Sequence, residues 1–126
     1  RTGKLDLIPA AHWPEPARVF EPEPLDGPVV GLTSYRVESG DEAEFMSAMG
    51  ALSRSRQRTG ATLWQLFRSG EQAATFVEVF VVPSWDEHLR QHHVRLTGQD
   101  LLIEQAVERH VQGEPVSEHL IAVRRP

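Results

Sequence analysis

With 126 residues and a formal net charge of -5, the chain has the length of one domain and lacks the basic balance of a nucleic-acid-binding protein. It contains no cysteine, which excludes disulfides, thiolate metal sites and cysteine nucleophiles. Its uncharged apolar runs are far shorter than the ~20 residues that a membrane-spanning helix needs, and no signal-peptide pattern is visible.

Residues 1–27 differ from the rest of the chain and are predicted to form a proline-rich, extended linker or arm. Five of the nine prolines lie in this segment, where each fixes the backbone and removes a hydrogen-bond donor. Trp13 and Phe20 are too apolar for a freely solvated linker, so we expect part of the arm to lie against the domain or a partner. The chain opens on Arg1 without an initiator methionine, which predicts a processed protein or a piece of a longer one.

Residues 28–126 show the patterns of a single α+β domain. Strands rich in β-branched and aromatic residues are predicted over 29–37, 61–68, 73–82 and 116–123, and the middle two form a hairpin. Capping-box patterns, in which Ser or Thr precedes an acidic residue by three positions, predict helices after Ser39, Ser84 and Thr97. With short connections, this order closes as a ferredoxin-like βαββαβ sandwich with a four-stranded antiparallel sheet.

Two helices carry apolar stripes that indicate which side faces the core. The inward residues expected in the first helix, which stops at Gly60, are Phe45, Met49 and Leu52. Those expected in the last helix are Leu102, Ile103, Ala106 and Val107. The arginines that end the first helix, Arg54, Arg56 and Arg58, are predicted to form a solvated face that complements the helix dipole.

The predicted sheet is apolar on both faces. The third strand places Phe76, Glu78, Phe80 and Val82 on one side and Thr75, Val77, Val79 and Val81 on the other. One layer of helices covers one face only, and an apolar sheet must be covered on both. A second copy of the same sheet would cover the other face, so the sequence predicts a homodimer packed sheet to sheet.

Several short motifs together resemble known families. The run Glu78-Val79-Phe80, Ser84-Trp85, His88-Leu89 and His92 is similar to antibiotic-biosynthesis-monooxygenase-like domains, which are dimeric α+β barrels. A longer series resembles the soluble C-terminal domain of major facilitator superfamily transporters of the transmembrane secretion effector, enterobactin-exporter-like, group. That series comprises Trp64-x-x-Phe67-Arg68, Glu78, Ser84-Trp85-x-x-His88-Leu89-Arg90-Gln91-His92, Arg95-x-Thr97, His119-Leu120-Ile121 and the lead Trp13-Pro14-Glu15-Pro16.

The resemblance implies an accessory domain of an exporter, for dimerisation or for binding and regulation by a small-molecule ligand. Its partners would then be a second copy and the membrane-embedded portion of the same chain. Its location would be the cytoplasmic side of the cell membrane, with this part of the protein soluble. The resemblance leaves open whether the chain is an enzyme and favours a non-catalytic domain. One alternative is a free-standing, cofactor-independent monooxygenase-like enzyme, and another is a haem-linked protein with His88 or His92 as axial ligand.

The residues from Phe76 to Thr97 hold the strongest candidates for a site, because Glu78 precedes a helix that carries three histidines. His88 and His92 are four residues apart and share a helix face, whereas His93 points away and is expected to be solvated. Two imidazoles at this spacing can hold a metal if Glu78 or His119 supplies a third ligand. No His-Glu-x-x-His motif is present, so no metal and no cofactor is expected.

The remaining candidates surround Glu78, whose carboxylate lies between two phenylalanines on the same strand face. A carboxylate on an apolar face must find partners or become protonated, which allows a structural ion pair, a base or a ligand anchor. The predicted partners are Arg36, Arg68, Arg95 and the histidine pair. Tyr35 could place its hydroxyl between the paired sheets, and Trp64 is either core or part of a ligand cage. The full set of ligand-binding candidates is Glu78, His88, His92, Tyr35, Trp64, Arg95 and His119.

Overall fold

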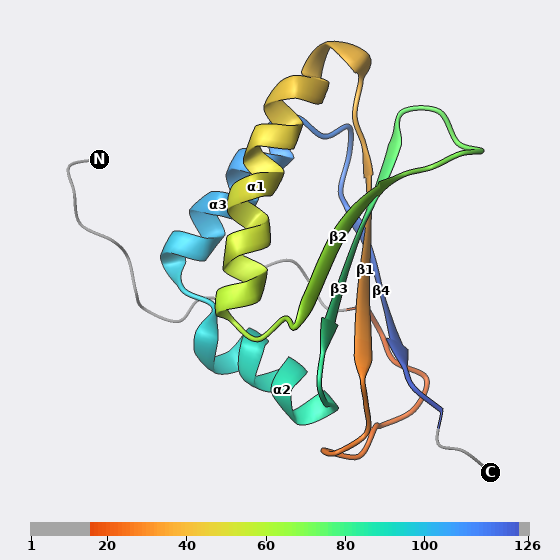
Figure 1. Cartoon of the computed structure of the whole chain (residues 1–126), viewed down its shortest axis with the longest axis vertical. Coiled ribbons are helices and arrows are strands. Elements are labelled where there is room, and N and C mark those ends of the chain that lie inside the picture. The colour runs from red at the N-terminus through yellow and green to blue at the C-terminus, as the bar shows by residue number, and fades with distance from the viewer. Residues whose placement is uncertain (1–15, 124–126) are drawn as a thin grey trace.

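A computed structural model describes residues 16–123, in which helices cover one face of a four-stranded antiparallel sheet (Figure 1). The sheet has the strand order β2-β3-β1-β4, which confirms the predicted ferredoxin-like fold. The strands are β1 (Val29–Arg36), β2 (Leu63–Arg68), β3 (Thr75–Val82) and β4 (Val116–Ile121). The helices are α1 (Glu42–Arg58), α2 (Trp85–Arg90) and α3 (Gly98–Glu108), with a 3-10 turn η1 (Ser39–Asp41) and a π-helical turn η2 (Gln91–Arg95).

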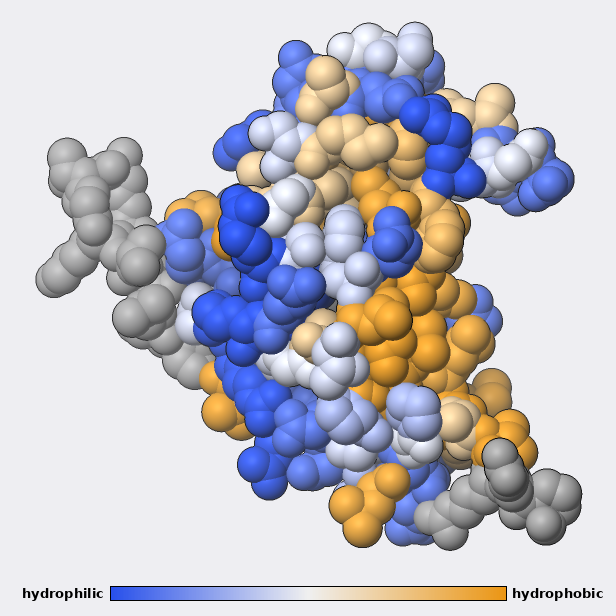
Figure 2. Space-filling model, viewed as in Figure 1, coloured by the Kyte–Doolittle hydropathy of each residue, from blue (hydrophilic) through white to orange (hydrophobic). Residues whose placement is uncertain are grey.

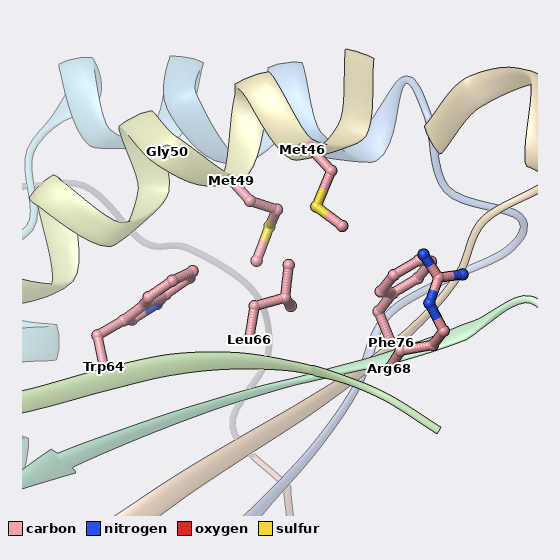
Figure 3. Close-up of a pocket in the computed structure, with 7 residues that line it drawn as sticks. All are labelled: Met46, Met49, Gly50, Trp64, Leu66, Arg68 and Phe76. Atoms are coloured by element: carbon pink, nitrogen blue, oxygen red, sulfur yellow. The ribbon is translucent and has the colours of Figure 1, made fainter. Parts of the chain in front are cut away.

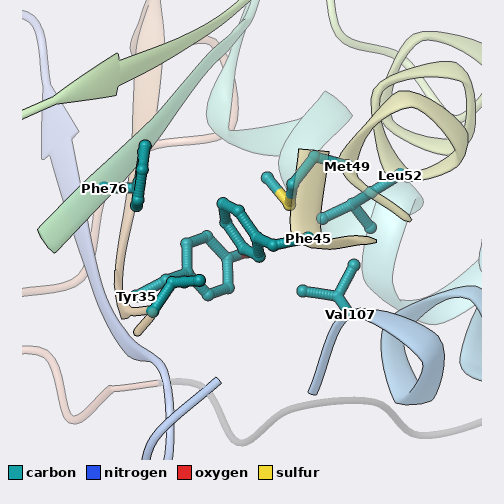
Figure 4. Close-up of a cluster of buried hydrophobic side chains, with 7 residues drawn as sticks. Tyr35, Phe45, Met49, Leu52, Phe76 and Val107 are labelled. Atoms are coloured by element: carbon teal, nitrogen blue, oxygen red, sulfur yellow. The ribbon is translucent and has the colours of Figure 1, made fainter. Parts of the chain in front are cut away.

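The main core lies between the sheet and helices α1 and α3. Its buried members are Tyr35, Val37, Phe45, Met49, Leu52, Phe76 and Val107 (Figure 4). The predicted inward stripe of α1 is therefore confirmed, because residues 45, 49 and 52 share one helix face. Burying each of these large side chains contributes about 1.5–3 kcal/mol relative to leaving it exposed.

Two of the three predicted helix caps are confirmed. Thr97 and Asp100 form a reciprocal capping box at α3, which satisfies backbone N–H groups that the first helical turn leaves open. At α2 the Ser84 side chain accepts a hydrogen bond from the backbone N–H of Glu87, as expected of an N-cap. The capping box predicted at Ser39 is wrong, because residues 39–41 form a 3-10 turn instead and α1 starts without a side-chain cap.

The inner face of α3 is more polar than its sequence suggests. Leu102, predicted to point inward, is 42% exposed, whereas Asp100 and Glu104 are buried. The cap at Thr97 sets the helix phase so that residues 100, 104 and 107 face α1. Asp100 accepts a hydrogen bond from Ser55 on α1 at 2.7 Å and pairs with Arg58, so polar contacts as well as apolar packing join the two helices.

The described part of the arm, residues 16–27, contacts the beginning of α2. The backbone N–H groups of Trp85 and Asp86 donate to the carbonyls of Asp26 and Pro24 at 2.7 and 2.8 Å. The guanidinium of Arg18 lies 4.9 Å from the centroid of the Trp85 ring. Trp13 and the other apolar residues before residue 16 lie outside the described residues.

The second face of the sheet has no helix over it. Large apolar side chains on this face are substantially exposed, namely Leu63, Phe67, Val116 and Leu120. Figure 2 shows hydrophobic residues gathered on the sheet side of the molecule and hydrophilic residues over the helices. Phe67 is 52% exposed in the single chain. Within residues 16–123, no helix has the length and apolar character needed to cross a membrane.

Candidate functional site

Glu78 lies at the centre of a sealed hydrogen-bond network between the sheet and α1. Its carboxylate is fully buried and accepts hydrogen bonds from the Tyr35 hydroxyl at 2.7 Å and from the Trp64 indole N–H at 2.8 Å. Arg56 donates to both carboxylate oxygens, from Nε at 2.9 Å and from Nη2 at 3.3 Å. Tyr35 thus points toward the helices, and the prediction that its hydroxyl lies between paired sheets is wrong.

Arg56 is the partner that sequence reasoning missed. Glu78 pairs with Arg56, whereas the predicted partners Arg68 and Arg95 pair with Glu42 and Glu87. The predictions that Arg36, Arg68 or Arg95 neutralises Glu78 and that Arg56 is solvated are therefore wrong, since Arg56 is 4% exposed. A signal for it exists in the sequence, since position 56 continues the inward stripe of residues 45, 49 and 52. Its basic side chain made the position look like a solvated helix end.

A glycine on β1 makes room beneath this network. Gly31 pairs with Phe80 across the β1–β3 ladder, and a Cβ atom at Gly31 would lie 2.4 Å from the Phe80 ring. The Arg56 guanidinium in turn lies 4.9 Å from the centroid of that ring. A side chain at position 31 would displace Phe80 and, with it, the packing of the buried arginine.

The electrostatics of the network favour a permanently ionised pair. Burial raises the pKa of Glu78, but the Arg56 charge and the hydrogen bonds from Arg56, Tyr35 and Trp64 outweigh it, so the pKa lies below its ordinary value. Burial and the adjacent Glu78 carboxylate raise the pKa of the Tyr35 hydroxyl well above its usual value. A carboxylate held ionised by four donor contacts is poorly suited to accept a proton from a substrate.

The histidine candidates form a separate cluster at the lower end of the helix layer. The ring centroids of His88 and His92 are 4.5 Å apart, and those of His88 and His119 are 4.4 Å apart. His88 is buried and stacks on Trp85 with a centroid distance of 4.8 Å, whereas His92 and His119 are partly exposed. His93 is exposed, as predicted. Of the two predicted third members, the fold brings His119 to the pair and holds Glu78 elsewhere.

Arg95 braces the end of η2 against the end of α1. Its Nη1 donates to the Glu87 carboxylate at 2.5 Å and to the backbone carbonyl of Thr59 at 3.2 Å. Gln91 makes a parallel link, because its amide donates to the Thr59 hydroxyl at 3.0 Å. Arg95 therefore positions the helical segment that carries His88 and His92.

A cavity of about 400 Å³ lies between α1 and β2 (Figure 3). It is lined by Met46, Met49, Gly50, Trp64, Leu66, Arg68 and Phe76. Figure 3 shows the two methionines reaching down from α1 toward Leu66 and Trp64 on β2. Trp64 is the one sequence-predicted candidate that lines this cavity, and its indole also reaches Glu78. The residues of the predicted site therefore lie in four places: the buried Glu78 network, the histidine cluster, the contacts of Arg95 and the wall of this cavity.

Comparison with known proteins assigns the family. The profile of the Transmembrane secretion effector family matches residues 1–126. The chain belongs to this family. Among curated proteins, none matches it.

Three solved structures with the same fold carry monooxygenase or oxygenase names. A proposed antibiotic biosynthesis monooxygenase from Caulobacter crescentus CB15 matches with a TM-score of 0.67 and 21% identity, over 80% of this chain and 94% of its own. A second, from Bordetella bronchiseptica, matches with a TM-score of 0.63 and 22% identity over 78% and 99%. SnoaB, a cofactor-independent oxygenase from Streptomyces nogalater, matches with a TM-score of 0.55 and 21% identity, over 78% of this chain and 93% of its own. At these identities, the comparison shows that this chain shares their fold and does not show that it shares their activity.

The buried pair predicts a specific pH dependence of stability. Because the folded-state pKa of Glu78 is lowered, its contribution is complete above its unfolded value near 4.5 and is lost as the pH falls through the folded value. Glu78→Gln removes the nearest counter-charge of the buried Arg56 guanidinium and leaves only the weaker influence of Glu104, so we expect it to lower the free energy of unfolding at pH 7 by about 3–5 kcal/mol. The difference from the natural protein should shrink as the pH falls toward 3, as measured by urea denaturation.

Glu44→Gln is the matched control, because it removes an exposed carboxylate of α1, the helix that carries Arg56. It should change the free energy of unfolding by less than about 0.5 kcal/mol at every pH. A Glu78→Gln deficit that stays constant down to pH 3 would contradict the assignment of an ionised, stabilising carboxylate.

Proposed function

We propose that the chain is a dimerising accessory domain of an exporter, placed on the cytoplasmic side of the cell membrane. The observation that carries this proposal is the match of the whole chain to the Transmembrane secretion effector family. The partner within the same protein would be a membrane-embedded transporter portion. The uncovered apolar face of the sheet supports the dimer, and the sealed state of Glu78 supports a non-catalytic role.

The dimer is supported by what the uncovered face exposes. β1 and β3 are the two central strands, and on this face Leu32 lies directly opposite Val79. Leu63 and Phe67 on β2, with Val116 and Leu120 on β4, extend the apolar surface to both edges. A surface that exposes this many large apolar side chains is rare on a monomer, and an identical copy offers a self-complementary cover.

The alternative is a free-standing, cofactor-independent oxygenase, and the likeness to monooxygenase-like structures supports it equally well at the level of the fold. The Glu78 network favours the accessory role, because Arg56, Tyr35 and Trp64 occupy the carboxylate that would otherwise serve as a base. The haem-linked alternative predicts a Soret band on reconstitution with haem.

The exporter assignment is tested by the membrane association and topology of the natural gene product. We expect the full-length protein to stay in the membrane fraction after an alkaline carbonate wash, because its other portion would contain apolar segments of ~20 residues. Protease should remove the domain described here in inverted vesicles and spare it in intact spheroplasts. A product that carbonate releases from the membrane would refute the exporter assignment and favour the free-standing oxygenase.

The dimer predicts that a charge at the centre of the uncovered face produces a monomer. Leu32→Lys places a cation there, opposite Glu118 of β4, so the strand pairing within one chain is retained while sheet-to-sheet packing would have to bury the charge. We expect the natural chain to sediment as a dimer and Leu32→Lys as a folded monomer.

Gln57→Lys adds the same charge to an exposed position of α1 and should leave the dimer intact. A natural chain that sediments as a monomer at every concentration would refute the proposed dimer. Dissociation by Gln57→Lys to the same extent would show that net charge, and not the sheet face, governs association.

The cavity between α1 and β2 supports a second part of the proposal, the binding of a small apolar ligand. Its volume of about 400 Å³ lies within the range of ~300–1,000 Å³ that is typical of small-molecule sites. Two methionines adapt to ligands of different shape, and Trp64 offers an aromatic wall. Gly50 contributes no side chain, and a Cβ atom there would meet Arg54 Nη1 at 3.9 Å and nothing closer.

Filling this space should abolish binding of an apolar probe. Gly50→Leu places a branched side chain at the cavity wall, so we expect the fluorescence increase of Nile red on mixing with the protein to fall at least about fivefold, following the loss of contact area. Leu32→Lys serves as the control, because it alters the sheet face and leaves the cavity unchanged. If Leu32→Lys abolishes the signal and Gly50→Leu retains it, the probe binds the open sheet face and not the cavity.

A further inference from the structure

We infer that His88, His92 and His119 form a binding site for a divalent first-row transition metal of the zinc type. The sequence alone predicts no metal, because it identifies two imidazoles on a helix and no certain third ligand. The fold supplies that ligand from β4. The inference goes beyond the proposed function and stands whether or not the chain is part of an exporter.

The three side chains meet the spatial requirement for a shared ion. Their potential ligand atoms all lie within 4.8 Å of one another, and this trio is the one such group of His, Cys, Asp or Glu found within residues 16–123. In a tetrahedral site with metal–nitrogen bonds of about 2.0–2.1 Å, neighbouring nitrogens lie about 3.3 Å apart. The inference requires that side-chain rotations close this difference when the ion binds.

The trio stands on elements that other contacts hold in place. His88 is buried and stacks on the buried Trp85 ring. His92 lies in the π-helical turn η2, which Gln91 and Arg95 tie to the end of α1. His119 lies on β4, where the ladder pairs it with Gly31 of β1. Ligands on fixed elements bind more tightly, because little conformational freedom is lost when the ion enters. A π-helical turn at this place is also typical of functional sites.

The ligand chemistry selects the class of ion. Imidazole nitrogens suit zinc, copper, nickel and iron, whereas magnesium and calcium require oxygen ligands that this trio lacks. Three neutral imidazoles do not offset the charge of the ion, and they leave one tetrahedral position open for a water or an anion. His92 and His119 are partly exposed, and His119 also lines a cavity of about 250 Å³ between residues 16–20 and β4. The fourth position is therefore accessible from solvent.

The test is metal titration of the tag-free chain after removal of bound metals with a chelator. We expect one Zn²⁺ per chain by calorimetry, and Co²⁺ should give the visible absorption bands of tetrahedral coordination. His119→Ala should weaken binding by more than the ~10–100-fold that loss of an outer-shell partner causes. Saturating Zn²⁺ should raise the Tm of the natural chain and leave that of His119→Ala unchanged, since a ligand that binds only the folded state stabilises it.

His93→Ala is the matched control, because it removes the exposed imidazole next to His92 and should leave affinity and stoichiometry unchanged. His92→Ala repeats the test if His119→Ala does not fold, as judged by circular dichroism. Absence of binding by the natural chain, or an equal loss of affinity in His93→Ala, would overturn the inference. A calorimetric stoichiometry of several weakly bound ions per chain would overturn it as well.

Discussion

The buried pair of Arg56 and Glu78 is the constraint on which the rest of the structure depends. Removing two charges from water costs several kcal/mol per ion, and the cost is offset only when geometry and hydrogen bonds are nearly complete. Here the Glu78 carboxylate receives two contacts from Arg56 and one each from Tyr35 and Trp64. The three donors come from α1, β1 and β2, so the pair fixes the helix on the sheet at one register.

The end of α1 joins this network to the histidine cluster. Arg56 points into the sheet, and three residues later Thr59 accepts hydrogen bonds from Gln91 and Arg95 of η2. The last turn of α1 therefore contributes Arg56 to the buried pair. Thr59, which follows that turn, positions the segment with His92. The end of α1 therefore helps to position both the inferred metal site and the buried carboxylate, although the two sites use different side chains.

The two faces of the sheet have different roles because one buries an ion pair and the other exposes apolar side chains. The face under the helices combines a core with a costly ion pair, and that pair selects one arrangement of the elements. The large side chains that the uncovered face exposes are mostly apolar, so the face is suited to an identical face of a second copy. The cavity between α1 and β2 lies on the covered side of the sheet and not on the uncovered face, which leaves a small-ligand site compatible with a dimer.

The sequence by itself determined the elements, the strand faces, the caps at Ser84 and Thr97, the inward stripe of α1 and the family resemblance. These features depend on residues a few positions apart, where the periods of helix and strand act. Tertiary structure alone decided that Arg56 and not Arg36, Arg68 or Arg95 neutralises Glu78, a partner 22 positions away. It also decided that His119 of β4 meets His88 and His92. Local patterns place a side chain on a face, but which faces meet depends on how helices and strands pack, and that packing is set by the whole core.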